Sequence, residues 1–300
     1  MTLQSILLQT FKDFEIVICD DCSKQDNFTE LHSFFNKNNF TNYKLFKHPK
    51  NVGIAKNFRA ACELASGKYI KGIGPGDLLF CDSTLFNTID FLEKKDSKVA
   101  FGLWQPYCIN DNGSISYHEH LIPRDIRPHK NNDQSSIQEK IIVHRDRIAG
   151  ATLIFNRAYI LKPELDITPI VKHAEDLVIV LSALHGDNID FLPHTFIWYE
   201  LDSGISLTPN PTFKALMMAD LENFYNFVHS KYSAHPLIIE SFKHMSKSNF
   251  MKSFYAKVIN RINHYKVSFN TKIPIKPIDG YLSANHFQQF MSDINDESKS

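Results

Sequence analysis

The chain has 300 residues, of which 43% are hydrophobic and 22% are charged, so it can bury a sizeable core and is not disordered as a whole. Lysine and arginine together number 33, as do aspartate and glutamate, and this balance excludes a chain-wide positive field that would attract nucleic acid. The five cysteines are too few and too scattered for the disulfide framework of a small secreted domain.

The first residues carry no basic segment of the kind that opens a signal peptide, and glutamines interrupt their apolar run. No apolar stretch approaches the roughly 20 residues of a membrane span, and residues 177–184 form one of the longest runs. We therefore expect a cytoplasmic protein, unless another feature carries it to the inner face of the plasma membrane.

Strand and helix patterns alternate over the first hundred residues. Strands are expected at residues 14–19, 43–46, 68–73 and 99–105, and amphipathic helices at 26–36, 51–65 and 83–92. Such alternation with short connections is typical of an α/β protein with a parallel sheet. Asp20 and Asp21 follow one strand, and residues 74–77 follow another. Because ligands of such sheets bind at the carboxyl ends of the strands, both groups are placed to meet one ligand.

The second half of the chain begins with a polar, irregular segment, residues 106–138, followed by an expected strand at 150–155, a helix at 173–184 and a strand at 189–199. Beyond residue 206 the pattern changes to helices alone. The first of these begins at Pro211 and has an apolar stripe, formed by Phe213, Leu216, Met217, Leu221, Phe224 and Val228. We therefore divide the chain into an α/β domain of residues 1–206 and a helical, partly basic region of residues 207–300.

Three runs in the first seventy residues resemble a known family. Residues 9–23, QTFKDFEIVICDDCS, resemble the QTYxDFEIIVVDDGS segment of family 2 glycosyltransferases, which have the GT-A fold. Residues 51–57, NVGIAKN, resemble the family's NxGxxxARN segment, and residues 65–70, ASGKYI, its AxGxYI segment. The resemblance implies a GT-A-type nucleotide-diphospho-sugar transferase domain, a mostly parallel sheet flanked by helices, with an α-helical C-terminal extension.

The donor side of the site follows from the first two runs. By similarity, Asp21 holds the nucleotide base and Asp20 is its neighbour, because a partly buried carboxylate at a strand end accepts base N–H groups strongly. Lys56 stands where the family usually has arginine and can act toward the nucleotide as a point charge, without a bidentate fork. The alternative is that Asp20 and Asp21 form an ordinary solvated turn and that Lys56 lies on an exposed helix face.

The family's D-x-D motif, which binds the divalent ion that neutralises the leaving diphosphate, is altered here. Counted forward from Tyr69, both aspartates fall on glycines, Gly74 and Gly76; counted back from Ser83, the second falls on Asp77. We prefer the second register, in which Asp77 faces the diphosphate as the one remaining carboxylate ligand. Leu201 also stands where the family often has a metal-binding histidine. A Mn²⁺ or Mg²⁺ cofactor is therefore doubtful, and Asp77 alternatively just closes a turn.

The acceptor side of the site is expected at Glu175 and Asp176. This pair resembles the family's ED motif, in which the aspartate is the general base that deprotonates the acceptor hydroxyl in inverting transfer. Gly150 resembles the family's acceptor-side glycine. The alternative reading of the pair is structural, because acidic residues are favoured in the first turn of any helix.

The beginning of the chain departs from the family pattern. Family members open with a strand and a turn that hold the nucleotide base, whereas this chain begins inside the helix that follows, at residues 5–9. We therefore expect an open edge in the sheet, and either a start assigned too late or a truncated product.

A basic segment lies in the C-terminal region. Residues 241–278 contain eight lysines and arginines, no aspartate or glutamate, and several interleaved aromatic residues. This composition suits an anionic membrane surface that would bring the protein to a lipid-linked acceptor, and no nucleic-acid recognition motif accompanies it. The alternative is a solvated helix face that packs on the domain or on a second subunit.

The resemblance and the residue pattern predict an inverting glycosyltransferase. It would move a sugar from a nucleotide donor, such as a UDP-sugar, to a hydroxyl of a bacterial surface glycan such as capsule or lipopolysaccharide. The alternative is a catalytically inactive GT-A-like protein that acts as a binding or assembly subunit.

Overall fold

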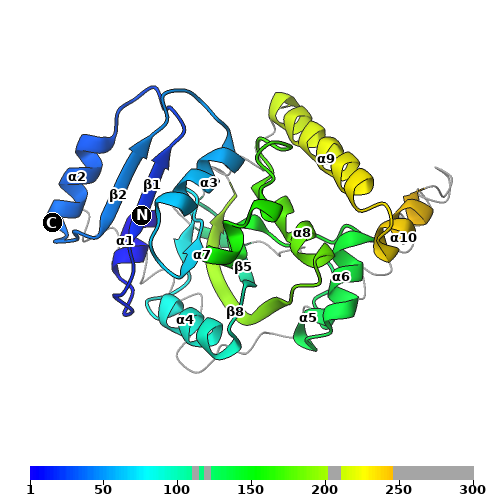
Figure 1. Ribbon diagram of the computed structural model, residues 1–300. Helices are drawn as coiled ribbons and strands as arrows, with labels where there is room; N and C mark the ends of the chain where they lie inside the picture. The colour runs from blue at the N-terminus through cyan, green and yellow to red at the C-terminus, as the bar shows by residue number, and fades with distance from the viewer. Residues whose placement is uncertain (110–114, 118–122, 202–210, 246–300) are drawn as a thin grey trace.

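The computed structural model describes residues 1–109, 115–117, 123–201 and 211–245. Two sheets form its framework (Figure 1). The smaller sheet pairs β1 (Ile16–Asp20) with β2 (Tyr43–Lys47) in parallel, with Ile16 opposite Tyr43. Helix α1 (Thr2–Leu7) precedes it, and α2 (Phe28–Lys37) connects its two strands. This βαβ unit is the one that the first strand and helix patterns predict.

The larger sheet has six strands in the described part of the chain. Its order is β3 (Tyr69–Lys71), β7 (Leu153–Asn156), β5 (Val99–Ile109), β8 (Ile189–Glu200) and β4 (Leu78–Leu79), and β6 (Ile115–Tyr117) also pairs with β5. The β5–β8 pair is parallel, but β3–β7, β5–β7, β4–β8 and β5–β6 are antiparallel. The expectation of a mostly parallel sheet is thus wrong in this detail, because β3 pairs with a strand far along the chain rather than with its sequence neighbours.

The two sheets are separate. Among the described residues, β1 pairs with β2 alone and β3 with β7 alone, so each leaves one edge without a strand partner. Contacts across the gap come from α3 (Ile54–Leu64), which packs on β1. Glu15, just before β1, also accepts hydrogen bonds from Ser66 and Gly67, whose segment leads into β3.

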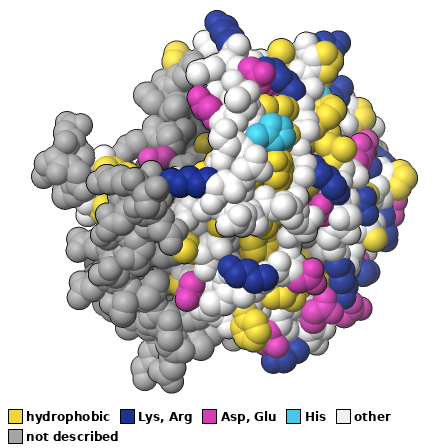
Figure 2. Space-filling view, turned by 90° about the vertical axis from the view of Figure 1, so that its left-hand side faces the viewer, with side chains coloured by type: hydrophobic (Ala, Val, Ile, Leu, Met, Phe, Trp, Pro, Cys, Tyr) yellow, Lys and Arg dark blue, Asp and Glu magenta, His cyan; other side chains and the backbone are white. Residues whose placement is uncertain are grey.

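The face beside α2 and β2 has mixed charge. Figure 2 shows positive and negative side chains interspersed over its described part, with hydrophobic side chains between them. On that part of the surface no single sign of charge dominates, in keeping with the balanced composition.

The remaining helices surround the larger sheet, and a short strand or turn separates most of them. They are α4 (Thr84–Lys95), α5 (Arg127–Lys130), α6 (Gln134–Ile142), α7 (Arg157–Ile160) and α8 (Val178–Leu184), with 3₁₀ turns at Gly150–Thr152, Pro163–Leu165 and Glu175–Leu177. Residues 106–138 are therefore not irregular throughout. Asp133 caps α6 by accepting from the Ser136 N–H group, and Ile137 and Ile141 bury one face of the helix.

The C-terminal region packs against the main core. Its described part consists of α9 (Pro211–Lys231) and α10 (Pro236–Met245). Phe224, Val228 and Ile238 are almost fully buried in the same cluster as β5, β8 and α8, whereas Leu216, expected in the buried stripe, is 44% exposed. The expected boundary at residue 206 and most of the basic segment, from residue 246 on, lie outside the described residues. No helix in the described part of the chain is long and apolar enough to cross a membrane.

Candidate functional site

Asp21 holds the loop that leads into α3. Its carboxylate oxygens accept the N–H groups of Val52 at 2.6 Å and of Gly53 at 2.9 Å. Gly53 has a φ of +89°, a backbone conformation that glycine adopts without strain, and it immediately precedes α3. The carboxylate at the end of β1 therefore fixes the first turn of the helix that carries Lys56.

Asp20 and Lys56 do not share this contact. Asp20 turns back on its own loop, where it accepts the Ser23 N–H group at 2.8 Å and pairs with Lys47 of β2 at 3.5 Å. Burial alone would raise the pKa of Asp20, but these hydrogen bonds and the Lys47 charge lower it. Lys56 is exposed on α3. Of the three donor-side residues predicted from the sequence, Asp21 is thus the one with a defined structural contact at the entrance to α3.

Asp77 lies buried in the turn between β3 and β4. It is 7% exposed, its N–H group donates to Gly74 O at 3.2 Å, and its Oδ1 accepts the N–H group of Glu200 at 3.2 Å. Burial raises the pKa of Asp77 to about 6, although the Glu200 N–H group and the Lys71 charge act in the opposite direction. Asp77 therefore closes a turn and also lies within the electrostatic reach of a lysine.

That lysine, Lys71, ends β3 and was not predicted from the sequence. Its ammonium group donates to Gly72 O and, at 2.5 Å, to Ala151 O. Burial lowers the pKa of Lys71 to about 7, while the Asp77 charge opposes this shift. Lys71 thus connects the turn that contains Asp77 to the segment that begins at Gly150. The sequence signal that could have identified Lys71 is its position at the end of an otherwise apolar strand.

The residues around Asp77 do not fit a divalent metal site of the D-x-D kind. Gly74 and Gly76 bring no carboxylate ligands, one oxygen of Asp77 already accepts a backbone N–H group, and the charge nearby is the ammonium of Lys71. In the parts of the chain that the structure describes, no three His, Cys, Asp or Glu side chains gather in an arrangement that could hold a metal ion.

Glu175 and Asp176 form the 3₁₀ turn that leads into α8, and both are half-buried. They face Gly150: a Cβ atom built there would lie 3.2 Å from the Asp176 Cβ and 3.6 Å from the Glu175 Oε1. Burial, reinforced by the charge of Asp176, raises the pKa of Glu175 well above its usual range. Burial also raises the pKa of Asp176, against the opposing charge of Arg147. Two neighbouring carboxyl groups with raised pKa values therefore lie beside Gly150.

One backbone hydrogen bond and one side-chain hydrogen bond connect the segments that carry the predicted groups. The Lys172 carbonyl oxygen accepts the N–H group of Ala55 at 3.0 Å, which ties the loop held by Asp21 to the segment before Glu175. On the other side, Lys71 binds Ala151, the neighbour of Gly150. The loops of Asp21, Asp77 and Asp176 therefore belong to one connected structure.

A second residue that sequence reasoning missed is Asp220, on α9. Its Oδ2 accepts three consecutive backbone N–H groups, those of Lys172 at 3.0 Å, His173 at 2.5 Å and Ala174 at 3.2 Å. Asp220 is 6% exposed. Its position within the apolar stripe of a helix was the signal that could have identified it, because a buried charge there requires partners.

A comparison with known protein families shows to which family the chain belongs. The model described as Glycosyl transferase family 2 matches residues 1–159, which are more than half of the chain. The chain belongs to glycosyl transferase family 2. The match ends before Glu175 and Asp176, so it does not bear on this pair of the family 2 glycosyltransferase.

Relatives of this glycosyltransferase match its first part. An uncharacterized glycosyltransferase of Rickettsia conorii is 31% identical over 128 residues, which are 42% of this chain and 20% of that protein. Another, from Rickettsia felis, is 33% identical over 111 residues, 37% of this chain and 17% of that protein. The chain thus spans about a fifth of the length of the curated relatives it matches.

Solved structures share the fold. The crystal structure of S. aureus TarS 1-349 in complex with UDP-GlcNAc has a TM-score of 0.52 at 19% identity, covering 89% of this chain and 74% of that one. The crystal structure of S. aureus TarS 1-349 has a TM-score of 0.51 at 16% identity, covering 90% and 86%. The likeness confirms the expected GT-A-type α/β fold.

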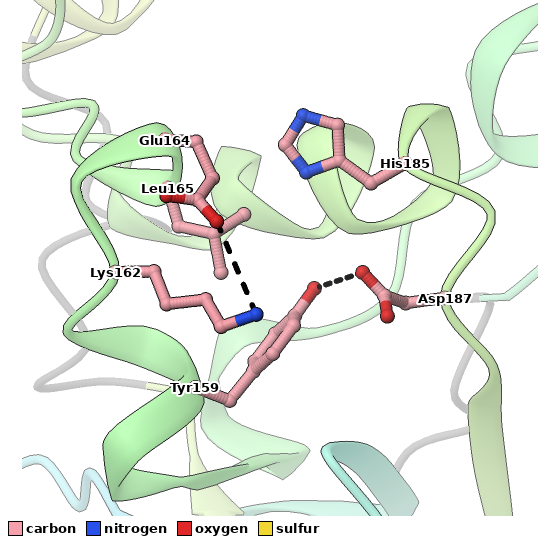
Figure 3. Close-up of a pocket in the computed structure, with 6 residues that line it drawn as sticks. All are labelled: Tyr159, Lys162, Glu164, Leu165, His185 and Asp187. Carbon is pink, nitrogen blue, oxygen red and sulfur yellow. Dashed lines mark hydrogen bonds and ion pairs between the residues drawn. The ribbon is translucent and has the colours of Figure 1, made fainter.

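A separate cavity of about 290 Å³ lies at the other end of α8, which spans about 10 Å. Its lining residues are Tyr159, Lys162, Glu164, Leu165, His185 and Asp187 (Figure 3). Most of its polar groups have protein partners: the Tyr159 hydroxyl donates to Asp187 at 2.9 Å, and Lys162 pairs with Glu164 at 3.9 Å. The cavity contains none of the predicted site residues and is not part of the candidate site.

Proposed function

We propose that this family 2 glycosyltransferase moves a sugar from a UDP-sugar to an acceptor hydroxyl, with inversion at the anomeric carbon and Asp176 as the general base. The observation that carries the proposal is the carboxyl pair Glu175–Asp176 packed against Gly150, on a loop joined to the loop of Asp21. Burial raises the pKa of Asp176, and a carboxylate with a raised pKa is a stronger base, which suits a general base.

In the proposed step, the acceptor oxygen attacks the anomeric carbon while its proton passes to the Asp176 carboxylate. The bond between the anomeric carbon and the diphosphate oxygen breaks, and UDP leaves from the opposite face. Glu175 lies beside the proposed base, and the negative charge of Asp176 adds to burial in raising the pKa of Glu175. No step of this mechanism passes through a metal ion, because the donor atoms around Asp77 do not fit one.

On the donor side, Asp21 orders the loop before α3, and we propose that the nucleotide lies against this loop, with Asp20, Lys56 and Asp77 as further contacts. Two features support a UDP donor. Asp21 lies within the first of the three sequence runs that resemble the family, and structures with the same fold are described as complexes with UDP and with UDP-GlcNAc.

The acceptor is proposed to be a bacterial surface glycan, carried on a lipid or on a growing chain. The bacterial origin of the relatives and the basic composition of residues 241–278 support this proposal. Cations near an anionic bilayer contribute about 1 kcal/mol each, so this segment could hold the enzyme at the membrane surface. Sedimentation with phosphatidylserine vesicles at low and high salt tests the membrane part, and no salt-sensitive pelleting would contradict it.

The transfer reaction is tested by calorimetry with UDP and by the release of UDP from UDP-GlcNAc and other UDP-sugars, with glycan acceptors or water. The Asp176→Asn variant should lose about 10²- to 10⁴-fold in rate, the usual contribution of a general base, while its UDP affinity stays within twofold. Asp90→Asn, which removes an exposed carboxylate of α4, is the matched control.

Three outcomes would contradict the proposal. Wild-type protein that does not bind UDP, or an Asp176→Asn variant that turns over normally, would overturn the donor or the base assignment, respectively. UDP binding without any release of UDP from UDP-sugars would favour a binding or assembly subunit instead.

A further inference from the structure

One oxygen of Asp220 gathers three neighbouring N–H groups of the segment just before the carboxyl pair. The N···O distances from Lys172, His173 and Ala174 are 3.0, 2.5 and 3.2 Å. Consecutive N–H groups that converge on one anion form a concave backbone site, and an ionised acceptor makes these bonds stronger than a neutral one would. Asp220 therefore restrains the backbone of three successive residues at once.

The restrained segment leads directly into the site. Ala174 is followed by Glu175 and Asp176, so the backbone that Asp220 holds is the backbone from which both carboxyl groups project. The opposite side of this segment is held as well, because the Lys172 carbonyl oxygen accepts the Ala55 N–H group of α3. The segment is thus clamped between the donor-side helix and α9.

Helix α9 makes a second contact with the same segment. The ring of Phe213, in its first turn, lies edge-on to the ring of His173 with centroids 5.5 Å apart. Farther along, Phe224 and Val228 are buried in the main core and anchor the helix independently of Asp220. The Asp220 carboxylate can therefore be removed without removing the packing that holds α9 in place.

We infer that Asp220 is a positioning residue of this glycosyltransferase: its carboxylate, presented by α9, sets the orientation of Glu175 and Asp176 toward Gly150. The inference rests on the proposed function of Asp176. It places part of the catalytic apparatus in the C-terminal helical region, beyond the residues that match the family model. The expected effect is on the position of the carboxyl pair, because a misplacement of about 1 Å at a reacting group can cost about 10²-fold in rate.

The first measurement is amide hydrogen exchange of full-length protein, which requires no substrate. Asp220→Ala should increase the exchange rate of residues 172–176 at least tenfold, while residues 224–231 of α9 keep their protection. Asp220→Asn should lie between wild type and Asp220→Ala, because its amide oxygen still accepts N–H groups but carries no charge. Glu222→Gln, which removes an exposed carboxylate of the same helix, should match wild type. Unchanged exchange at residues 172–176 in Asp220→Ala would overturn the inference.

The second measurement is the release of UDP from UDP-GlcNAc at a temperature well below unfolding, together with the Kd for UDP. Asp220→Ala should lower kcat about 10- to 100-fold and leave the Kd for UDP within twofold, with partial recovery in Asp220→Asn. A merely structural role would lower the Tm without changing kcat per folded molecule, and that result would contradict positioning. If wild type neither binds UDP nor releases it from UDP-GlcNAc, the proposed function fails, and hydrogen exchange alone decides whether Asp220 holds the segment.

Discussion

The carboxylates of Asp21 and Asp220 each hold a neighbouring loop by accepting its backbone N–H groups, and the two loops are in contact. Asp21 accepts the N–H groups of Val52 and Gly53, and Asp220 accepts those of residues 172–174. The hydrogen bond from Ala55 N to Lys172 O, 3.0 Å long, joins the two loops. The loop proposed to hold the donor and the segment that leads into Glu175 and Asp176 are thereby joined by a backbone hydrogen bond.

Replacing Asp21 tests the donor side. Asp21→Ala leaves two N–H groups without their acceptor, which costs about 1–3 kcal/mol of folding free energy, and should weaken UDP binding at least tenfold. Asp21→Asn should be milder, because its amide oxygen still accepts one of the bonds. Calorimetry with UDP and thermal unfolding measure both effects, with Asp13→Ala at an exposed position as the control. Wild-type UDP affinity in Asp21→Ala would show that this loop does not hold the nucleotide.

A methyl group at Gly150 tests the packing behind the base. The new Cβ of Gly150→Ala would lie 3.2 Å from the Asp176 Cβ, inside the contact distance of about 3.5–4.0 Å, so the carboxyl pair must move. We expect kcat to fall about tenfold with unchanged UDP affinity. Gly67→Ala is the control, since its Cβ meets the Tyr69 carbonyl oxygen at an ordinary 3.6 Å. Equal kcat values in the two variants would contradict this arrangement of Gly150 and Asp176.

The raised pKa of Glu175 makes stability depend on pH. Above pH 4.5 the unfolded chain loses this proton while the folded protein keeps it, so the free energy of unfolding should fall as pH rises through the native pKa. Glu175→Gln removes this dependence and should be relatively more stable at pH 8 than at pH 5, with Tm rising by about 2–4 °C for each kcal/mol recovered. Thermal unfolding at both pH values measures this, with Glu222→Gln as the control. Parallel curves for wild type and Glu175→Gln would refute the shift.

The lowered pKa of Lys71 has the opposite effect on the pH dependence of stability. Between about pH 7 and 10.5 the unfolded chain holds a proton that the folded protein has lost, so the free energy of unfolding should rise with pH in this window. Lys71→Met should remove at least about 1 kcal/mol of that rise. Urea unfolding at pH 7, 8.5 and 9.5 measures it, and Lys95→Met, at an exposed position of α4, is the control. An unchanged slope in Lys71→Met would mean that Lys71 is not buried in solution.

Local patterns predicted the elements that carry the donor side. The helix expected at 51–65 is α3, Ile54–Leu64, and the apolar run before Asp20 is β1, because the spacing of apolar residues reports which face of an element is buried. Helix α6 was missed within a polar segment, although Ile137 and Ile141 are spaced as on one helix face. A polar composition concealed a short amphipathic pattern there.

The features that could not be predicted depend on contacts between distant parts of the chain. The antiparallel pairing of β3 with β7 has no local signal, because strand periodicity is the same in both directions. The hydrogen bonds of Asp220 join residues that are up to 48 positions apart, and no spacing rule connects a helix residue to a distant loop. The sequence could place Glu175 and Asp176 beside a helix start, but not identify what holds them there.

The position of Asp220 along the chain also has a consequence in time. Ala174, the last residue before the carboxyl pair, is synthesised 46 residues before its partner Asp220. At usual translation speeds this interval lasts roughly 2 to 9 s. Until α9 has been synthesised, the N–H groups of residues 172–174 lack the carboxylate that accepts them in the finished protein. Under the positioning role proposed for Asp220, a chain that ends before α9 is expected to leave Glu175 and Asp176 misaligned.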